Sequence, residues 1–394
     1  MQEPAQKPKQ YMLMLQRLKE RRSARLMTKG GRLATKGTNA YMQQQSNSKH
    51  IATKVISIKS AIIIAVACIT LIIGIPALTI ILSEADLEPI ELDLDPDAFV
   101  VQLHRSKTDT IEELPLEQYI RGVIAAEMPA DFQLEALKAQ ALAARTYFIN
   151  KWSRSTGPIS DDYRIDQAYL SDAELKLRWG GTYIENSNRI NQAINETKGM
   201  ILTYENTPIE AFFFSTSNGY TENSEDVWSS KIPYLRSVES PWDTISPKFQ
   251  ETKIIPISEV HDKLLLTVPV TAWSGQDTIP RMAAIKRSNG KRIVEMVIGD
   301  QKFTGREIRE KLGLNSTHFT VAIKGNDMHF TTFGYGHGVG MSQWGAEAMA
   351  REGKTATEIA RYFYQGIEIK PYTEVASLIP KLQQTFAVNK KTNQ

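Results

Sequence analysis

At 394 residues the chain can hold one large domain or two ordinary ones, and its 42% hydrophobic and 23% charged residues are typical of a folded protein rather than a disordered one. The net charge of +3 conceals an uneven distribution, with Lys and Arg concentrated in residues 1–60 and acidic residues at 84–97. The single cysteine, Cys68, excludes an intrachain disulfide and a cysteine-rich zinc site.

The N-terminal part of the chain reads as a basic tail followed by a membrane span. Residues 1–60 either stay solvated or touch anionic lipid. Residues 61–82 carry no charge, and about 22 residues at about 1.5 Å each can cross a hydrocarbon core of about 30 Å. No small-residue cleavage pattern follows, so we predict an uncleaved transmembrane helix. Lysines up to Lys59 precede it and no basic residue follows until Arg105, which predicts a cytoplasmic N-terminus and an outer C-terminal domain at the cell membrane.

The next segment predicts a spacer and then two helices. Residues 83–108 alternate acidic with apolar or proline positions and should form an extended linker, with the catalytic domain over 109–394. A first helix should end before Pro129, because proline cannot donate a helix hydrogen bond and its ring clashes with the preceding turn. This places Glu127 at a helix end. Apolar residues then recur every three or four positions, which predicts a helix over 136–151 with one buried stripe.

Strands and helices alternate over the remainder of the chain. Thr355 and Glu358 are spaced as a capping box at the start of the last helix. The expected fold is α+β, a mixed α/β outer catalytic domain with a smaller subdomain inserted at about 240–330, on a single N-terminal transmembrane helix. The strands are predicted at 200–202, 209–214 and 292–298, and the helices at 304–312 and 357–364.

The first candidate for chemistry is the segment 125–129, AAEMP, in which one carboxylate stands among apolar residues at a helix terminus. Burial there would raise the pKa of Glu127 towards neutrality, as a general acid for glycoside cleavage requires. The alternative is an ordinary ion pair with Arg121 or Arg145. The residues by themselves leave both interpretations open.

Two further segments carry polar side chains in unusual settings. Residues 212–222, FFFSTSNGYTE, suit a sugar, which has apolar ring faces and many hydroxyls, but they also suit a buried strand that ends in a polar turn. Residues 334–345, GYGHGVGMSQWG, indicate a tight loop with a function, and they lack the spacing and the lysine of a phosphate-binding loop. His337 in this loop is expected to position substrate, to hold Glu127, or only to make a structural hydrogen bond.

Taken together and in this order, the segments resemble the stage II sporulation protein D (SpoIID) family, whose members carry an AAEMP-type motif, a following helix, an STSNGYTENSEDVW-like segment and a GYGHGVGMSQWGA signature. The resemblance extends over about residues 114–370. It implies a membrane-anchored peptidoglycan lytic transglycosylase of the engulfment machinery in sporulation. Such an enzyme cleaves denuded glycan strands, from which an amidase has removed the stem peptides, and leaves 1,6-anhydro-N-acetylmuramyl ends.

The resemblance also assigns residues. The family's catalytic glutamate falls on Glu127, which would act first as an acid and then as a base, in contrast to the two carboxylates of ordinary glycosidases. Some relatives carry Cys and His in the loop after the long helix, but residues 160–169 contain neither, so we predict no metal, and no cofactor is expected. The expected substrate contacts are Ser215, Ser217, Asn218, Tyr220, His337 and Gln343, with Arg145 or Lys231 as partners of the lactyl carboxylate.

The partners that the resemblance implies are peptidoglycan glycan strands, the membrane, a sporulation amidase (SpoIIP-like) and a membrane scaffold (SpoIIM-like), with no nucleic acid. Two other functions compete with the enzyme. One is a non-catalytic amidase enhancer or glycan-binding scaffold, which would use the same groove, and the other is a membrane-anchored sensor. The presence of Glu127 favours the enzyme, because a pure binder would have no required role for it.

Overall fold

The computed structural model describes Ile63, Ala67 and residues 69–75, 88–94, 99–228, 230–273 and 282–381. Contacts between residues divide the chain into two units, residues 1–77 and residues 78–394. The described residues of the first unit are helical. The predicted basic tail, and the predicted membrane span apart from those few residues, lie outside the described residues. Within the described part of the chain no helix has both the length and the apolar character needed to cross a membrane.

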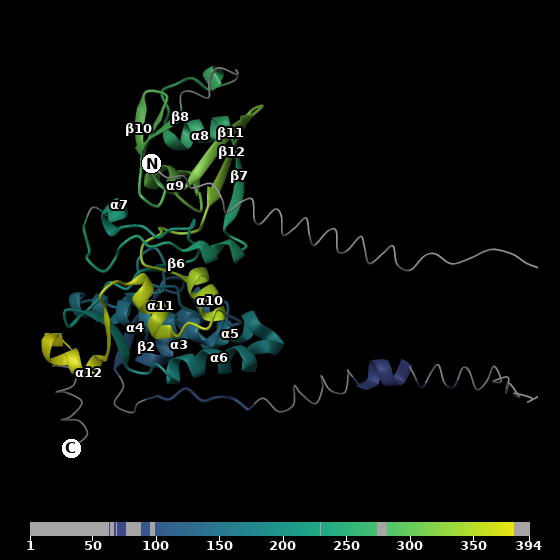
Figure 1. Ribbon diagram of the computed structural model, residues 1–394, viewed down its shortest axis with the longest axis vertical. Coiled ribbons are helices and arrows are strands. Elements are labelled where there is room, and N and C mark those ends of the chain that lie inside the picture. Colours follow the sequence, from purple (N-terminus) through teal and green to yellow (C-terminus); the bar gives the residue numbers. More distant parts are fainter. Residues whose placement is uncertain are drawn as a thin grey trace, which may run out of the picture. The chain divides into compact units, whose positions relative to one another are not determined.

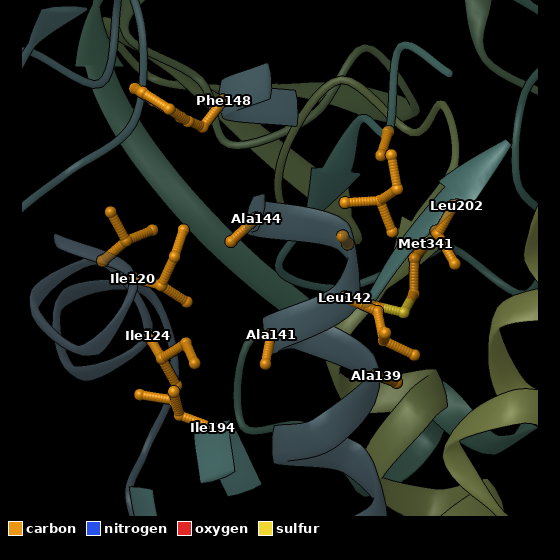
Figure 2. Packing of buried hydrophobic residues seen from close by; sticks show 14 of the residues in the cluster. Ile120, Ile124, Ala139, Ala141, Leu142, Ala144, Phe148, Ile194, Leu202 and Met341 are labelled. Atoms are coloured by element: carbon orange, nitrogen blue, oxygen red, sulfur yellow. The ribbon is translucent and has the colours of Figure 1, made fainter. Parts of the chain in front are cut away.

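The long helix α4 (Leu134–Arg154) stands at the centre of the larger core of the second unit and confirms the helix predicted over 136–151. Its alanines, such as Ala141 and Ala144, are fully buried and let neighbouring elements approach closely. Figure 2 shows Ile120 and Ile124 on one side of α4, and Leu142 of α4 pointing towards Met341 on the other. The helices in contact with α4 are α3 (Leu116–Glu127), α6 (Tyr183–Asn195), α10 (Gln343–Arg351) and α11 (Ala356–Phe363).

The helix ends follow the local chemistry that the sequence predicts. Helix α3 ends at Glu127, and the Met128 N–H closes it by donating to the carbonyl of Ile124, one residue before Pro129. Helix α11 begins with the predicted capping box, because the Thr355 side chain accepts from the Glu358 N–H while the Glu358 side chain accepts from the Thr355 N–H. The predicted helix ends at Glu127 and Thr355 are therefore confirmed.

A small sheet corrects the predicted linker. Strand β1 (Val100–Arg105) pairs antiparallel with β2 (Thr110–Pro115) and parallel with β3 (Ile159–Ser160). The linker prediction over 83–108 was wrong for β1, because Val101 and Leu103 alternate into the core with the period of a strand. Residues 88–94 are not a free spacer either, since their main chain hydrogen-bonds the side chains of asparagines 188, 191 and 195 on α6.

The other strands of the larger core are short. The predicted strand 200–202 is confirmed by β4 (Met200–Tyr204), which lies between β5 (Thr207–Pro208) and β14 (Glu368–Pro371). The strand predicted over 209–214 is reduced to β6 (Phe213–Phe214), because the Phe212 N–H turns back to the carbonyl of Glu210. Strand β6 pairs in parallel with β13 (Met341–Ser342), which brings together two of the segments that the sequence singled out.

A second set of buried side chains, all between Ile255 and Phe330, forms its own hydrophobic core within residues 250–333, here called the insertion. In Figure 1 helices α8 and α9 lie beside strands β7, β11 and β12. Three strands, β7 (Gln250–Pro256), β11 (Phe319–Lys324) and β12 (Asp327–Phe333), form one sheet, while β8 (Met282–Arg287), β9 (Ile293–Ile298) and β10 (Gln301–Thr304) form another. The helices not yet given are α5 (Asp172–Trp179), α7 (Ser224–Trp228), α8 (Ile257–Leu264), α9 (Gly305–Leu312) and α12 (Tyr372–Val375).

Candidate active site

Glu127, the last residue of α3, is partly exposed and faces the loop that precedes α5. The backbone N–H of Ala168 in that loop donates to its Oε1 at 3.0 Å. Burial is the largest influence and raises the pKa of Glu127, while the Ala168 N–H and the Gln343 side chain lower it in part. The result is a carboxyl group, on a partly exposed residue, that keeps its proton to higher pH than an ordinary glutamate.

The alternative of an ion pair at Glu127 is wrong for both of the proposed partners. Arg121 Nη1 binds Asp172 Oδ1 at 3.0 Å, and Arg145 Nη2 binds Glu117 Oε2 at 2.6 Å. Within the described residues no charged side chain contributes to the pKa shift of Glu127. Glu127 therefore has no counter-ion among the described residues.

Gln343 brings the glycine-rich segment to Glu127. It is the first residue of α10, which Ser342 caps by accepting from the Gly345 N–H at 3.3 Å. The Gln343 side chain lowers the Glu127 pKa by hydrogen bonding to the carboxyl group, and its buried Nε2 has no other hydrogen-bond partner among the described residues. An amide nitrogen carries two N–H groups, so one of them is left for a ligand oxygen to accept from.

Trp344, the residue after Gln343 in α10, is hydrogen-bonded to Ser215. The Trp344 backbone N–H donates to the Ser215 carbonyl at 3.1 Å, and the Trp344 ring packs edge-on against Phe132 with centroids 4.8 Å apart. Ser215 and Trp344 are both partly exposed. Of the predicted contacts, Gln343 is the one that the structure brings to Glu127, and Ser215 is hydrogen-bonded to the residue that follows Gln343 in α10.

His337 is surrounded by other groups of the protein, as expected of a structural rather than a substrate-binding residue. Its imidazole lies among aromatic rings, with centroids 5.7 Å from Phe214 and 5.1 Å from Trp228, and its Nδ1 accepts from the Val339 N–H at 3.1 Å. Burial, and then the charges of two arginines, lower the pKa of His337 to about 3, so the ring is neutral at physiological pH. The structural alternative raised from the sequence is the one that these contacts favour, and no hydrogen bond joins His337 to Glu127.

Three predicted contacts from the serine-rich segment serve the junction with the insertion. Ser217 is fully buried, and its N–H donates to Asp243 Oδ1 at 2.7 Å. Asn218 Nδ2 donates to the Gly290 carbonyl at 2.6 Å. The partly exposed ring of Tyr220 is covered by Lys291, whose Nζ lies 5.0 Å from the ring centroid. In this conformation the Ser217 N–H and Asn218 Nδ2 have protein partners, while the buried Asn218 Oδ1 has none among the described residues.

The two basic residues predicted for the lactyl carboxylate lie in different surroundings. Arg145 is fully buried and forms a two-pronged ion pair with Glu117, with Nε to Oε1 at 2.9 Å and Nη2 to Oε2 at 2.6 Å. Its prediction as a substrate contact is corrected, because no ligand can reach a guanidinium with no exposed surface. Lys231 is exposed in the segment after α7 and has no ion pair among the described residues.

Sequence reasoning missed a buried ion pair between the core and the insertion. Arg292 Nη1 donates to the Gly336 carbonyl at 2.8 Å, and Arg292 Nε lies 3.7 Å from Glu222 Oε1. Burial raises the pKa of Glu222 to about 7, although the charge of Arg292 opposes the rise. The available signal was the glycine pattern, since a Cβ on Gly338 would lie 2.7 Å from Arg292 Nε.

The loop that supplies the Ala168 N–H is held by carboxylates. Asp161 Oδ2 accepts from Arg105 Nε at 2.9 Å, and Asp166 Oδ2 accepts from the Ser160 N–H at 2.9 Å. In the part of the chain that the structure describes, no group of three or more His, Cys, Asp or Glu is placed to hold a metal ion.

Comparison with known proteins agrees with the resemblance read from the motifs. The family profile described as SpoIID, stage II sporulation protein, matches residues 104–204, which include Glu127 and α4. The stage II sporulation protein D of Bacillus amyloliquefaciens is 48% identical over 275 residues, which cover 68% of this chain and 78% of that protein. The chain belongs to the SpoIID family. The stage II sporulation protein D of Bacillus subtilis strain 168 is 46% identical with the same coverage, and the amidase enhancer of that strain is 32% identical over 303 residues, 64% of this chain and 40% of that protein.

Proposed function

We propose that this SpoIID-family chain is a peptidoglycan lytic transglycosylase that acts in sporulation, during engulfment, on denuded glycan strands. The observation that carries the proposal is the state of Glu127. Its pKa is raised by burial, the residue as a whole is partly exposed, and no charged group among the described residues shifts the pKa. Ordinary glycosidases place a second carboxylate roughly 5–10 Å from the first, as nucleophile or as base for water. A single carboxyl group suits a reaction in which the substrate supplies its own nucleophile.

The proposed reaction uses Glu127 twice. Protonated Glu127 donates its proton to the glycosidic oxygen as the bond to C1 of the muramyl sugar breaks. The resulting carboxylate then takes the proton of the muramyl C6 hydroxyl, whose oxygen attacks C1 and closes the 1,6-anhydro ring. Glu127 ends protonated, so no water is consumed and no second carboxylate is required. The Ala168 N–H, which donates to Glu127 Oε1 at 3.0 Å, stabilises the carboxylate between the two steps.

Gln343 has a defined part in this scheme. Its buried Nε2 hydrogen-bonds the carboxyl group that must reach the glycosidic oxygen, and it has no other partner among the described residues. A substrate oxygen in that position would receive a hydrogen bond that the free protein lacks, and a hydrogen bond completed only with substrate favours the bound state. The partly exposed Ser215 and Trp344 would then form the adjoining wall, the tryptophan as an apolar surface for a sugar ring.

The decisive experiment incubates the full-length chain with peptide-free glycan strands and analyses the products by mass spectrometry, beside Glu127→Gln and the control Glu185→Gln. Glu185 is an exposed glutamate in the first turn of α6 with no role at the site. Products ending in 1,6-anhydromuramic acid are expected from the wild type and the control and not from Glu127→Gln. Hydrated reducing ends would show a hydrolase instead, and cleavage by Glu127→Gln would remove Glu127 from the chemistry.

A second function is favoured by one comparison, the 32% identity to a protein named amidase enhancer. In that case the chain would bind glycan and stimulate a cell-wall amidase without cleaving anything. The same incubation with added amidase separates the two functions. Stimulated release of stem peptides that is equal for wild type and Glu127→Gln, with no glycan cleavage by either, would support the enhancer.

The cellular setting is also proposed. The uncharged residues 61–82 and the lysines before them support a single-pass anchor in the cell membrane, with residues 100–394 outside. Family membership supports a sporulation amidase and a membrane scaffold as partners. Protease added to protoplasts should digest residues 100–394 and spare the N-terminal tail, and an intact outer part would contradict this topology.

A further inference from the structure

Glu347 is a fully buried glutamate that the proposed reaction does not use. It lies in α10, four positions after Gln343, so the two side chains share one face of the helix. Its Oε1 accepts from Arg351 Nε at 2.6 Å, and its Oε2 accepts from the backbone N–H of Gln133 at 2.6 Å. Burial of a carboxylate is costly unless its oxygens are hydrogen-bonded, and here one of the two bonds joins α10 to the backbone of another element.

The backbone donor, Gln133, ends the turn that leads from Glu127 to α4. Helix α3 ends at Glu127 and α4 begins at residue 134, so the turn spans only residues 128–133. On α6, Arg189 fixes this turn, because its guanidinium donates to three successive carbonyls. These are the carbonyls of Ala130 at 2.9 Å, Asp131 at 3.3 Å and Phe132 at 2.6 Å. A group bonded to Gln133 is therefore bonded to a turn of fixed shape that starts at the carboxyl-bearing residue.

Helix α10 meets the chain before, within and at the end of this turn. The Gln343 side chain hydrogen-bonds the carboxyl group that precedes the turn. The Trp344 ring packs against Phe132 inside the turn, with centroids 4.8 Å apart. The Glu347 carboxylate binds the N–H at its end. Three residues of α10 thus follow the chain from 127 to 133.

The first turn of α10 is held from another direction. The Ser342 hydroxyl donates to the buried carboxylate of Asp243, which also accepts from the Ser217 N–H at 2.7 Å. These bonds fix where the helix starts but not the direction in which it runs. The bond from Glu347 to Gln133 lies one turn further on, so it fixes the second turn of α10 relative to the end of α3.

We propose that Glu347 is a positioning residue, which holds α10 to the turn after Glu127 so that Gln343 stays within hydrogen-bond distance of the Glu127 carboxyl group. The inference rests on the proposed function, in which Glu127 is the reacting group. Glu347 acts through Gln343 and the turn, and it needs no contact with substrate. A misplacement of about 1 Å at a distance from the chemistry can cost about 100-fold in rate, so a bond of this kind can matter as much as a direct contact.

The test is an NMR titration of the Glu127 carboxyl carbon in the full-length chain carrying Glu347→Leu, which keeps a side chain of similar size and removes both acceptors. Because the Gln343 hydrogen bond lowers the Glu127 pKa, its loss should raise that pKa. In a chain that already carries Gln343→Leu, Glu347→Leu should add no further rise, because the contact through which it acts is gone. Should Glu347→Leu not fold, Gln133→Pro deletes the donor at a residue whose φ is already −58°, and it should give the same rise.

Two further variants are controls, and both should titrate as the wild type does. Glu347→Gln keeps one oxygen that can accept from the Gln133 N–H. Glu135→Leu removes a matched bond elsewhere in the core, in which Glu135 Oε2 accepts from the Ala356 N–H at 2.6 Å. Like Glu347, Glu135 also binds a basic side chain of its own helix, Lys138, at 2.7 Å.

Two titration results would overturn the proposal. One is an unchanged or lowered Glu127 pKa in folded Glu347→Leu, and the other is an equally large rise in the Gln343→Leu chain, which would show a route that avoids Gln343. The proposed reaction is judged separately, from the products of the wild type. If the wild type cleaves peptide-free strands, Glu347→Leu should lower kcat by up to about 100-fold with little change in KM, and an unchanged kcat would also count against the proposal. If it does not cleave them, the reaction is refuted and the titration still decides whether Glu347 positions Glu127.

Discussion

Replacing Arg145 by methionine should destabilise the fold rather than selectively weaken glycan binding. The Arg145 guanidinium has no exposed surface, is joined to Glu117 by hydrogen bonds of 2.9 and 2.6 Å, and reaches the Met200 carbonyl at 3.1 Å. The variant leaves the Glu117 carboxylate buried without its partner. Removal of one member of a buried ion pair costs about 3–5 kcal/mol. At about 2–4 °C per kcal/mol, the thermal midpoint should fall by roughly 6–20 °C.

The assay is thermal unfolding of the full-length chain followed by circular dichroism, with Glu117→Gln and the double variant beside Arg145→Met. The double variant removes both charges, so it should regain most of the stability that either single variant loses. Glycan binding measured below the lowered midpoint should be near that of wild type. An unchanged midpoint together with lost binding of peptide-free strands would refute the buried-pair interpretation and return Arg145 to the substrate groove.

A Gln343→Leu exchange removes an amide that lowers the pKa of Glu127, so an NMR titration of the Glu127 carboxyl carbon should show its pKa rise, and a fall or no change would count against this contact. Burial raises the pKa of Glu222 from 4.5 to about 7, so the wild-type protein loses stability as the pH rises through that window, whereas Glu222→Gln does not. The free energy of unfolding should be measured in urea at pH 5 and at pH 8 for both proteins. Between these two pH values the wild type should lose up to about 3 kcal/mol more than the variant. Gly336 has φ +112° and a Cβ there would lie 2.8 Å from the Cβ of Phe214, so Gly336→Ala should lower the thermal midpoint, and an unchanged midpoint would show that the loop can relax.

The sequence predicts those features that local chemistry determines. Pro129 ends α3 whatever packs around it, and the pair Thr355 and Glu358 begins α11 through bonds within one turn. Strand β1 was missed because acidic residues dominate the composition of the predicted linker 83–108 that contains it. Val101 and Leu103 nevertheless alternate with the period of a strand. Capping and proline effects act within about one helical turn, so they can be predicted without knowledge of the fold.

Glu127 could be found for a similar reason, since its apolar neighbours and the helix end are adjacent in sequence. Its two polar neighbours could not be found, because the Ala168 N–H comes from a loop far along the chain and Gln343 from a still later helix. Arg145 was misassigned despite a usable signal. It follows Ala141 by four positions and precedes Phe148 by three, so it lies on the same buried helical stripe, and a charged residue on such a stripe indicates an internal ion pair.

The glycine-rich loop shows why a dense signature does not by itself identify ligand contacts. Gly338 is required because the Arg292 guanidinium lies against it, and Gly336 because Phe214 approaches it and both of its backbone polar groups bond to the insertion. A loop that closes on protein and a loop that closes on a sugar need the same residue types, namely glycines and short polar side chains. What separates the two is whether the polar groups find partners within the chain. Asn218 Nδ2 and His337 Nδ1 have such partners, whereas Asn218 Oδ1 has none among the described residues and Gln343 Nε2 has none there besides Glu127, so these two atoms are where a ligand is to be sought.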